Sequence, residues 1–267
     1  RAPGIRWPST RRPTASAACA SELARIAAVQ GREIHLGLEP EPDCLLENTT
    51  DAVNFFEREL LPLGTAWLRD ERGLSPSAAE QTLRRHVGVC FDACHAAVCF
   101  ENLAAGPDWL KRQGIRISKV QLSSALCARA TPAAALRLEP FLDNVYLHQV
   151  RQRTPGGTRG YDDLTPALLS RWRRDTRQDG PETRVHFHVP LDFPGDPVLG
   201  STAHELSPAF LAAAMRAGAG HFEIETYTFD VLPPELRRAD LADSVAREFR
   251  WILPRFAQAH PLQDKPT

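Results

Sequence analysis

The chain has 267 residues; 43% are hydrophobic, 24% are charged, and 32 basic against 33 acidic side chains give a net charge of −1. The hydrophobic fraction is too high for a disordered chain, and no apolar run reaches the roughly 20 residues of a transmembrane helix. A charge so close to zero offers no overall field for a polyanion, so nucleic acid is disfavoured as a partner. We therefore expect one large domain with a substantial core.

The N-terminal segment 1–14 is rich in Pro and Arg, which predicts a coil and not a secretory signal. Because the chain starts with Arg and its only methionine is Met215, we interpret it as a fragment of a longer protein. The domain is then expected over residues 15–258, beginning with a helix over 15–30. Residues 259–267 are expected to form a polar tail.

The six cysteines contain no C-x-x-C pair, and four of them lie in or beside apolar stretches. This usage is typical of small buried thiols in a reducing compartment, so we expect a cytoplasmic protein. The alternative is a thiolate nucleophile at Cys94, next to His95. We favour the buried thiol, because neighbouring side chains at a strand end point in opposite directions.

Short apolar segments alternate with longer helical patterns, which predicts an α/β architecture with a parallel sheet. The predicted strands are 33–39, 87–92, 117–123, 185–189 and 221–227, with a weaker β-like segment at 144–150. Four of the helices begin with a hydroxyl residue followed by proline, the preferred types at the N-cap and the first helical position. These starts are Ser75-Pro76, Thr131-Pro132, Thr165-Pro166 and Ser207-Pro208, and a last helix is predicted over 240–258.

The predicted strands alternate between apolar and polar positions. In 185–189, for example, Val185, Phe187 and Val189 share one face while His186 and His188 share the other. A parallel strand buried on both faces normally reads as an unbroken apolar run. An antiparallel sandwich with one wet face would also alternate, but the helices between the strands argue against it.

A barrel satisfies both observations, because helices cover the outer face and polar groups fill the interior. We therefore predict a (β/α)8 TIM barrel. Five clear strands are fewer than eight, so the barrel is expected to be truncated at its N-terminus, with strands 4 to 8 present. An open doubly wound sheet is less favoured, because no glycine-rich nucleotide-binding loop follows any strand.

Ionisable or amide side chains lie at the carboxyl end of every predicted strand. They are Glu39, Asp92 with His95, Gln121, His186 with His188, and Glu225. Carboxylates and imidazoles together suit a divalent ion such as Zn or Mn, and carboxylates with water also accept Mg. The alternative is that these groups pair with nearby cations or are simply hydrogen-bonded. We favour one divalent metal ion, because Lys119 is the only inward cation and unpaired buried carboxylates are costly.

The residues of this predicted site have different roles. We assign Glu39, Asp92, His188 and Glu225 as metal ligands. His95 and His186 are candidates for a fifth ligand or for proton transfer, and Lys119 for electrostatic assistance. Gln121, His148 and Tyr227 are candidate substrate contacts, although His148, like Glu41 and Glu223, also fits a structural role.

The strand ends resemble those of the xylose-isomerase-like barrel superfamily, which includes sugar isomerases, epimerases and nucleases of the endonuclease IV type. The segments that carry this resemblance are LGLEPEP, FDACHA, KVQLSSAL, HFHVPL and EIETYT. Over about residues 31–233, longer phrases such as LEPEPDCLLE, GVCFDACHAAVCFE and ETYTFDVLP are more closely similar to the metabolite traffic protein EboE family. That family is encoded with clusters that make or export secondary metabolites.

The resemblance implies a sugar-isomerase-like barrel, a small polar metabolite such as a sugar as substrate, and other proteins of the same cluster as partners. Gln121 stands where the superfamily has a histidine, and His186 where the nuclease branch often has an aspartate. A trinuclear zinc site is therefore not expected, and a single metal ion is.

Three functions remain open on this basis. The first is a metal-dependent isomerase or epimerase, in which the ion stabilises the negative charge that follows proton removal. The second is a non-catalytic carrier of a biosynthetic intermediate on the same barrel. The third is a phosphodiesterase of the endonuclease IV type, since seven arginines between residues 151 and 177 could contact phosphate.

Overall fold

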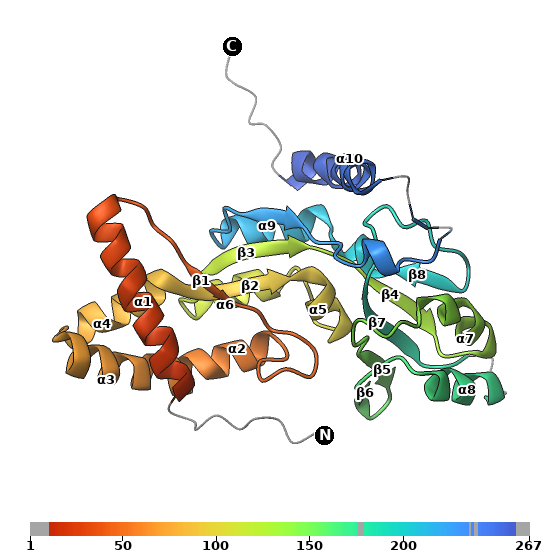
Figure 1. The fold of residues 1–267 in the computed structure, drawn as a ribbon, viewed down its shortest axis with the longest axis horizontal. Coiled ribbons are helices and arrows are strands. Elements are labelled where there is room, and N and C mark those ends of the chain that lie inside the picture. Colours follow the sequence, from red (N-terminus) through yellow and green to blue (C-terminus); the bar gives the residue numbers. More distant parts are fainter. Residues whose placement is uncertain (1–10, 176–178, 235, 238–239, 260–267) are drawn as a thin grey trace, which may run out of the picture.

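The computed structural model describes residues 11–175, 179–234, 236–237 and 240–259. Over these residues the chain is a mixed α/β protein with one parallel and one antiparallel sheet, which follow one another along the longest axis (Figure 1). None of the described helices is long and apolar enough to span a membrane.

The parallel sheet has four strands in the order β1, β2, β3, β9. These strands are β1 (Leu36–Leu38), β2 (Val87–Asp92), β3 (Ile117–Leu122) and β9 (Phe222–Ile224). The predicted alternation is confirmed here: Val87, Val89 and Phe91 belong to the hydrophobic core, whereas Cys90 and Lys119 line a cavity on the other face. One face of the sheet is therefore apolar and the other polar.

Helices cover the apolar face of this sheet. They are α1 (Arg11–Gln30), α2 (Thr49–Phe55), α3 (Leu61–Arg72), α4 (Pro76–His86), α6 (Gly106–Arg112), α9 (Pro208–Arg216) and α10 (Leu241–Ala259), and a π-helical turn (Phe56–Leu60) joins α2 to α3. Their buried side chains, among them Phe56, Leu83 and Phe210, share one core with β2 and β3. Helix α1 starts at Arg11, within the segment expected to be coil, and residues 1–10 and 260–267 lie outside the described part.

The four helix starts predicted from a hydroxyl residue followed by proline are confirmed. They open α4, α7 (Pro132–Leu138), α8 (Pro166–Arg174) and α9. Each hydroxyl accepts a hydrogen bond from the backbone N–H three residues later: Ser75 from Ala78, Thr131 from Ala134, Thr165 from Leu168 and Ser207 from Phe210. The cap thus satisfies one of the N–H groups that a helix start leaves unpaired.

The antiparallel sheet has five strands in the order β6, β5, β7, β4, β8. These strands are β4 (Ala125–Arg129), β5 (Val150–Thr154), β6 (Gly157–Tyr161), β7 (Glu182–His188) and β8 (Leu199–Ser201). Leu126, Val185 and Phe187 form a second core with side chains of α7 and α8. Figure 1 shows these two helices beside the sheet, away from the parallel one.

The described strands form no closed barrel, and the strand of His186 and His188 is not parallel as we predicted. β7 pairs antiparallel with β4 and β5, and β9 takes the position beside β3. The cause is β4, a strand that the sequence analysis missed. Only Ser123 and Ser124 separate it from β3, whereas a parallel return needs a crossover of about a dozen residues or more. The chain therefore continues directly into a second sheet.

Segment 144–150 was expected to be β-like, but only Val150 belongs to a strand. The Oδ1 of Asp143 accepts hydrogen bonds from the backbone N–H groups of Val145 and Tyr146, which bends the chain into a turn. A side chain that captures backbone N–H groups in this way competes with the ladder of a sheet.

Candidate metal centre

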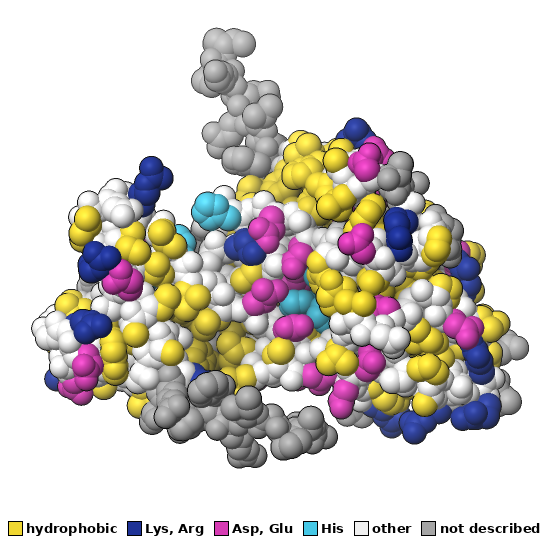
Figure 2. Space-filling model, viewed as in Figure 1, with side chains coloured by type: hydrophobic (Ala, Val, Ile, Leu, Met, Phe, Trp, Pro, Cys, Tyr) yellow, Lys and Arg dark blue, Asp and Glu magenta, His cyan; other side chains and the backbone are white. Residues whose placement is uncertain are grey.

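The carboxyl ends of β2, β3 and β9 meet the end of β7 at the junction of the two sheets. The backbone N–H of Glu225 donates to the carbonyl oxygen of Leu122 at 3.2 Å, and the Nδ1 of His188 lies 2.9 Å from the carbonyl oxygen of Glu225. His188 thus reaches the parallel sheet although its own strand belongs to the antiparallel one. Figure 2 shows acidic and histidine side chains gathered near the middle of this face of the molecule.

Asp92 is the last residue of β2 and the N-cap of α5 (Ala93–Val98). Its Oδ1 accepts hydrogen bonds from the backbone N–H of His95 at 2.8 Å and from the hydroxyl of Ser123 at 2.9 Å. Its Oδ2 is buried and has no hydrogen-bond partner among the described residues. Burial raises the pKa of Asp92, but His95, His188 and these hydrogen bonds outweigh it and hold the pKa below its usual value. A charged oxygen is therefore left without a partner.

Three histidine rings are held in the same way, each through its Nδ1. The Nδ1 of His95 lies 3.0 Å from the Pro40 carbonyl oxygen, that of His186 2.7 Å from Gln149 Oε1, and that of His188 2.9 Å from the Glu225 carbonyl oxygen. These oxygens only accept, so each Nδ1 carries a proton, and in the neutral ring the lone pair lies on Nε2. Metal-binding histidines are typically oriented by such a contact at the second nitrogen.

The free nitrogens of two of these rings point into the cluster without a partner. His186 Nε2 and His188 Nε2 are buried and hydrogen-bond to none of the described residues. Burial lowers the pKa of His188 to about 4 and that of His186 well below its usual value. Both rings are therefore neutral at physiological pH, which is the form that binds a metal ion.

Two glutamates complete the acidic side of the cluster. Burial raises the pKa of Glu39, and burial with the charges of Asp92 and Glu39 raises the pKa of Glu225 to about 7. Glu225 Oε2 is another buried atom without a hydrogen-bond partner in the described part of the chain. Carboxylates that converge without a cation cost several kcal/mol. A bound cation would remove this cost.

The donor atoms fall into overlapping groups of three, in each of which all atoms lie within 4.8 Å of one another. The groups are Glu39–Asp92–Glu225, Asp92–His95–His188, Glu41–His95–His186 and Cys94–His186–His188. This cluster, in which Asp92, Cys94 and the three histidines are buried and Glu39 is exposed, could hold a metal ion. Its imidazole nitrogens and carboxylate oxygens are ligand types of zinc and manganese. The four predicted ligands are divided between two groups that share Asp92.

The other predicted site residues lie around this cluster. Lys119 forms an ion pair with Glu223 in a cavity of about 520 Å³ that Glu39 also lines. Gln121 is buried and accepts a hydrogen bond from the thiol of Cys90. Tyr227 packs its ring on His188, with ring centres 4.6 Å apart.

His148 lies behind the cluster and is buried. Its Nδ1 lies 3.0 Å from the His186 carbonyl oxygen, and its Nε2 contacts the carboxylate of Asp143. Both ring nitrogens are therefore engaged. This arrangement fits the structural role that the sequence analysis left open for His148, and it anchors the backbone of β7 at His186.

Sequence reasoning gave too little weight to Glu41, Cys94 and Gln149. Cys94 and His95 lie on the first turn of α5, where neighbouring residues do not point in opposite directions as they would on a strand. Both therefore offer donor atoms to the cluster. Gln149 belongs to a loop just before β5, and no pattern in the sequence connects it with His186.

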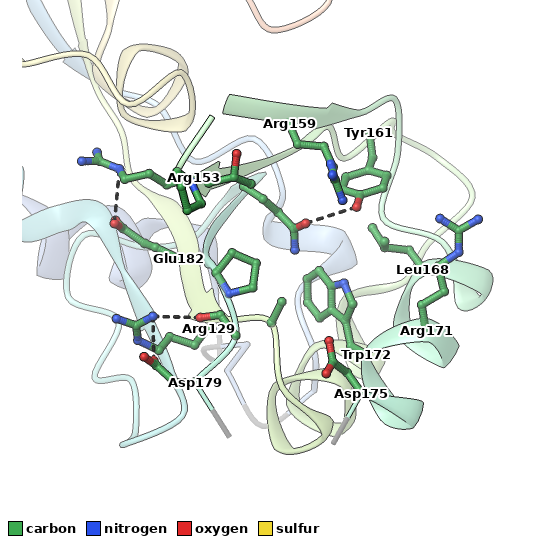
Figure 3. A pocket seen from close by; sticks show the side chains of 16 residues that line it. Arg129, Arg153, Arg159, Tyr161, Leu168, Arg171, Trp172, Asp175, Asp179 and Glu182 are labelled. Carbon is green, nitrogen blue, oxygen red and sulfur yellow. Dashed lines mark hydrogen bonds and ion pairs between the residues drawn. The ribbon is translucent and has the colours of Figure 1, made fainter. Parts of the chain in front are cut away.

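Three arginines of the arginine-rich segment line a separate cleft of about 880 Å³ between the β5–β6 hairpin and α8, which shares no residue with the donor cluster (Figure 3). The arginines that line it are Arg129, Arg153, Arg159 and Arg171. The positive charge of two of these arginines is compensated by an acidic side chain. Arg129 pairs with Asp179 at 2.9 Å, and Arg153 pairs with Glu182 at 3.5 Å. Arg177 lies outside the described residues.

Comparisons of the chain with protein-family models, with curated proteins and with solved structures found no match.

Proposed function

We propose that the cluster binds one divalent metal ion and serves an isomerase- or epimerase-type reaction on a small polar metabolite. The observation that supports this best is that Asp92 Oδ2, His188 Nε2 and Glu225 Oε2 are buried without a hydrogen-bond partner in the described part of the chain, and that Asp92 shares one donor group with His188 and another with Glu225. A protein rarely leaves several such atoms unpaired at one place, because each costs roughly 1–3 kcal/mol or more. A shared cation supplies the missing partner for all of them.

Glu39, Asp92, His188 and Glu225 are the ligands in this proposal. A divalent ion held by them would polarise a hydroxyl or carbonyl oxygen and stabilise the negative charge of a deprotonated metabolite. His95 and His186 are then the proton-transfer groups, because each ring is anchored at Nδ1 and has Nε2 available.

The remaining predicted residues contribute unequally. The charge of Lys119 is compensated by Glu223, so we assign this lysine to the wall of the cavity next to Glu39. The side-chain oxygen of Gln121 accepts a hydrogen bond from the thiol of Cys90. Tyr227 is 37% exposed and touches a proposed ligand, so it is the substrate contact that we retain.

On its resemblance to the EboE family, we further propose that the metabolite belongs to a secondary-metabolite pathway and is handled in the cytoplasm with other proteins of the cluster. A non-catalytic carrier would use the same ion and the same site, so only turnover separates it from an enzyme. A phosphodiesterase is less well supported, because acidic residues compensate part of the arginine cleft.

The proposal is tested by metal analysis of the full chain after stripping with a chelator and reloading with Zn, Mn or Mg in turn. We expect stoichiometric binding of at least one of these ions by the unmodified chain, and loss of binding in Glu39→Gln and Glu225→Gln. The matched control is Glu248→Gln, because Glu248 is a buried glutamate outside the cluster, bonded to the Leu191 N–H and to the hydroxyl of Thr226.

Retention of stoichiometric metal in both cluster variants would refute the proposed ligand set. Turnover is then measured on a panel of sugars and hydroxy acids with the loaded protein. Conversion supports the enzyme, and binding without conversion supports the carrier.

A further inference from the structure

The loop over residues 143–147 displays apolar side chains beside the metal cluster. Val145 is 68% exposed, Tyr146 39% and Leu147 65%. Neighbouring large apolar side chains at the surface often mark a place where a ligand or partner binds. The loop over residues 143–147 is therefore a candidate binding site on the described surface.

The conformation of this loop is fixed from within. Asp143 Oδ1 accepts hydrogen bonds from the backbone N–H groups of Val145 and Tyr146, at 2.7 and 3.0 Å. The chain is anchored again at His148, whose backbone N–H donates to Asp163 at 2.8 Å and whose ring contacts Asp143. The backbone that carries the apolar side chains is therefore held in place before any ligand arrives, which reduces the entropy cost of binding.

A row of rings connects this loop with a proposed metal ligand. The rings of Tyr146 and Tyr227 meet edge to face with their centres 4.9 Å apart, and Tyr227 in turn lies 4.6 Å from the ring of His188. Neither phenol hydroxyl hydrogen-bonds to a residue of the described ranges. In Figure 2, hydrophobic side chains adjoin the acidic and histidine side chains at the centre of the face.

We propose that the substrate carries a flat apolar group next to its metal-binding oxygens, and that Tyr146 and Tyr227 bind this group. A sugar uses the polar cluster but offers the two rings no flat apolar group. A ligand with both parts satisfies the cluster with its oxygens and covers the rings with its apolar part. This inference rests on the proposed metal site, since the oxygens of the ligand need the ion.

The test uses two probes that hold a metal ion through the same pair of oxygens, acetohydroxamate and benzohydroxamate. Their affinities for the metal-loaded full chain are measured by calorimetry and divided by their affinities for the free ion. We expect the phenyl compound to bind about tenfold tighter after this correction, the increment expected from one buried aromatic contact.

Tyr146→Ala is the decisive variant, because this residue touches no proposed ligand. It should remove most of the preference for benzohydroxamate while acetohydroxamate affinity and metal content stay unchanged. Leu136→Ala is the control, because Leu136 is also an exposed apolar side chain (61%) but lies on α7. It should leave the preference intact.

Equal corrected affinities of the two probes for the loaded unmodified chain would overturn this inference and leave the metal site standing. A preference that survives Tyr146→Ala would overturn it as well. Absence of bound metal, with neither probe binding, would refute the proposed function, and the inference would fail with it.

Discussion

Asp92 ends β2, and its carboxyl group caps α5 and supplies a donor atom to the cluster that could hold a metal ion. The two carboxylate oxygens have different roles. Oδ1 accepts hydrogen bonds from the backbone N–H of His95 and the hydroxyl of Ser123, and Oδ2 has no hydrogen-bond partner in the described structure. Structure and metal binding can therefore be separated by substitution at this one position.

We expect Asp92→Asn to fold, because the amide oxygen can still accept both hydrogen bonds. In a chelator its free energy of unfolding should equal or exceed that of the unmodified chain, since one of three converging carboxylates loses its charge. Asp92→Ala loses the cap as well and should be less stable by about 1–3 kcal/mol. Chemical denaturation with chelator and with added metal checks both variants.

Added metal should stabilise the unmodified chain and have little effect on Asp92→Asn, because an ion that binds only the folded state raises the free energy of unfolding. An equal stabilisation of both by metal would mean that Asp92 is not a ligand.

At the level of single residues, three of the predicted ligands lie close together in the structure. Glu39, Asp92 and Glu225 were found because each lies at the polar end of an alternating strand, and the structure brings them into one group. The ion pair between Lys119 and Glu223 could not be predicted from the pattern of a single strand. It depends on the register of β3 against β9, two strands about a hundred residues apart in the chain.

At the scale of elements, Glu33 joins the start of β1 to α4 and to the segment before β3. Its carboxylate contacts His35, Arg116 and Arg85. Hydrogen bonds from these three residues, that of His35 first, lower the pKa of Glu33 from 4.5 to about 2. A group whose pKa is lower in the folded state stabilises the fold above its unfolded pKa and loses this effect as the pH falls.

We therefore expect the contribution of Glu33 to be complete above about pH 5 and to disappear gradually between about pH 4.5 and pH 2. The carboxylate is more than a third exposed, so solvent screening reduces its contribution to about 1 kcal/mol. Unfolding free energies of the unmodified chain and of Glu33→Gln, measured across this range, should differ near neutral pH and converge at low pH. A difference that does not change with pH would contradict the mechanism.

Elements with a local signal were predicted, and those that depend on distant pairing were not. The caps of α4, α7, α8 and α9 are local, because hydroxyl, proline and helix lie within four residues of each other. Strand β6 is mostly exposed and contains two glycines, so no apolar pattern marks it. It forms because β5 offers a partner strand across a short turn.

The whole molecule differs most from the prediction in how its sheets are connected. The alternating pattern in 185–189 correctly placed His186 and His188 on one face of a strand, but the same pattern suits a parallel strand in a barrel and an antiparallel strand with one polar face. The choice between them was decided by the two-residue link from β3 to β4. The cluster of donor side chains nevertheless forms, because the end of β7 returns to the end of β9 through the contact of His188 with Glu225.

Arg151 holds the two halves of the molecule together next to this cluster. It lies on β5 of the antiparallel sheet and is 5% exposed. Its guanidinium donates to Asp43 at 2.7 Å and to Glu47 at 3.1 Å, in the segment that follows β1 of the parallel sheet. This segment also contains Glu41, a member of the donor cluster.

Arg151→Met should lower the free energy of unfolding by about 2 kcal/mol, because charge-assisted hydrogen bonds are lost while Asp43 and Glu47 partly regain water. A double-mutant cycle with Asp43→Asn isolates the pairwise contribution, which we expect to be about 1 kcal/mol. If the two substitutions were additive, the pair of Arg151 with Asp43 would contribute nothing to the stability. A coupling of the expected size, with weaker metal binding in Arg151→Met, would show that this ion pair positions the segment of Glu41 against β7 and so keeps the donors of the two sheets within reach of one ion.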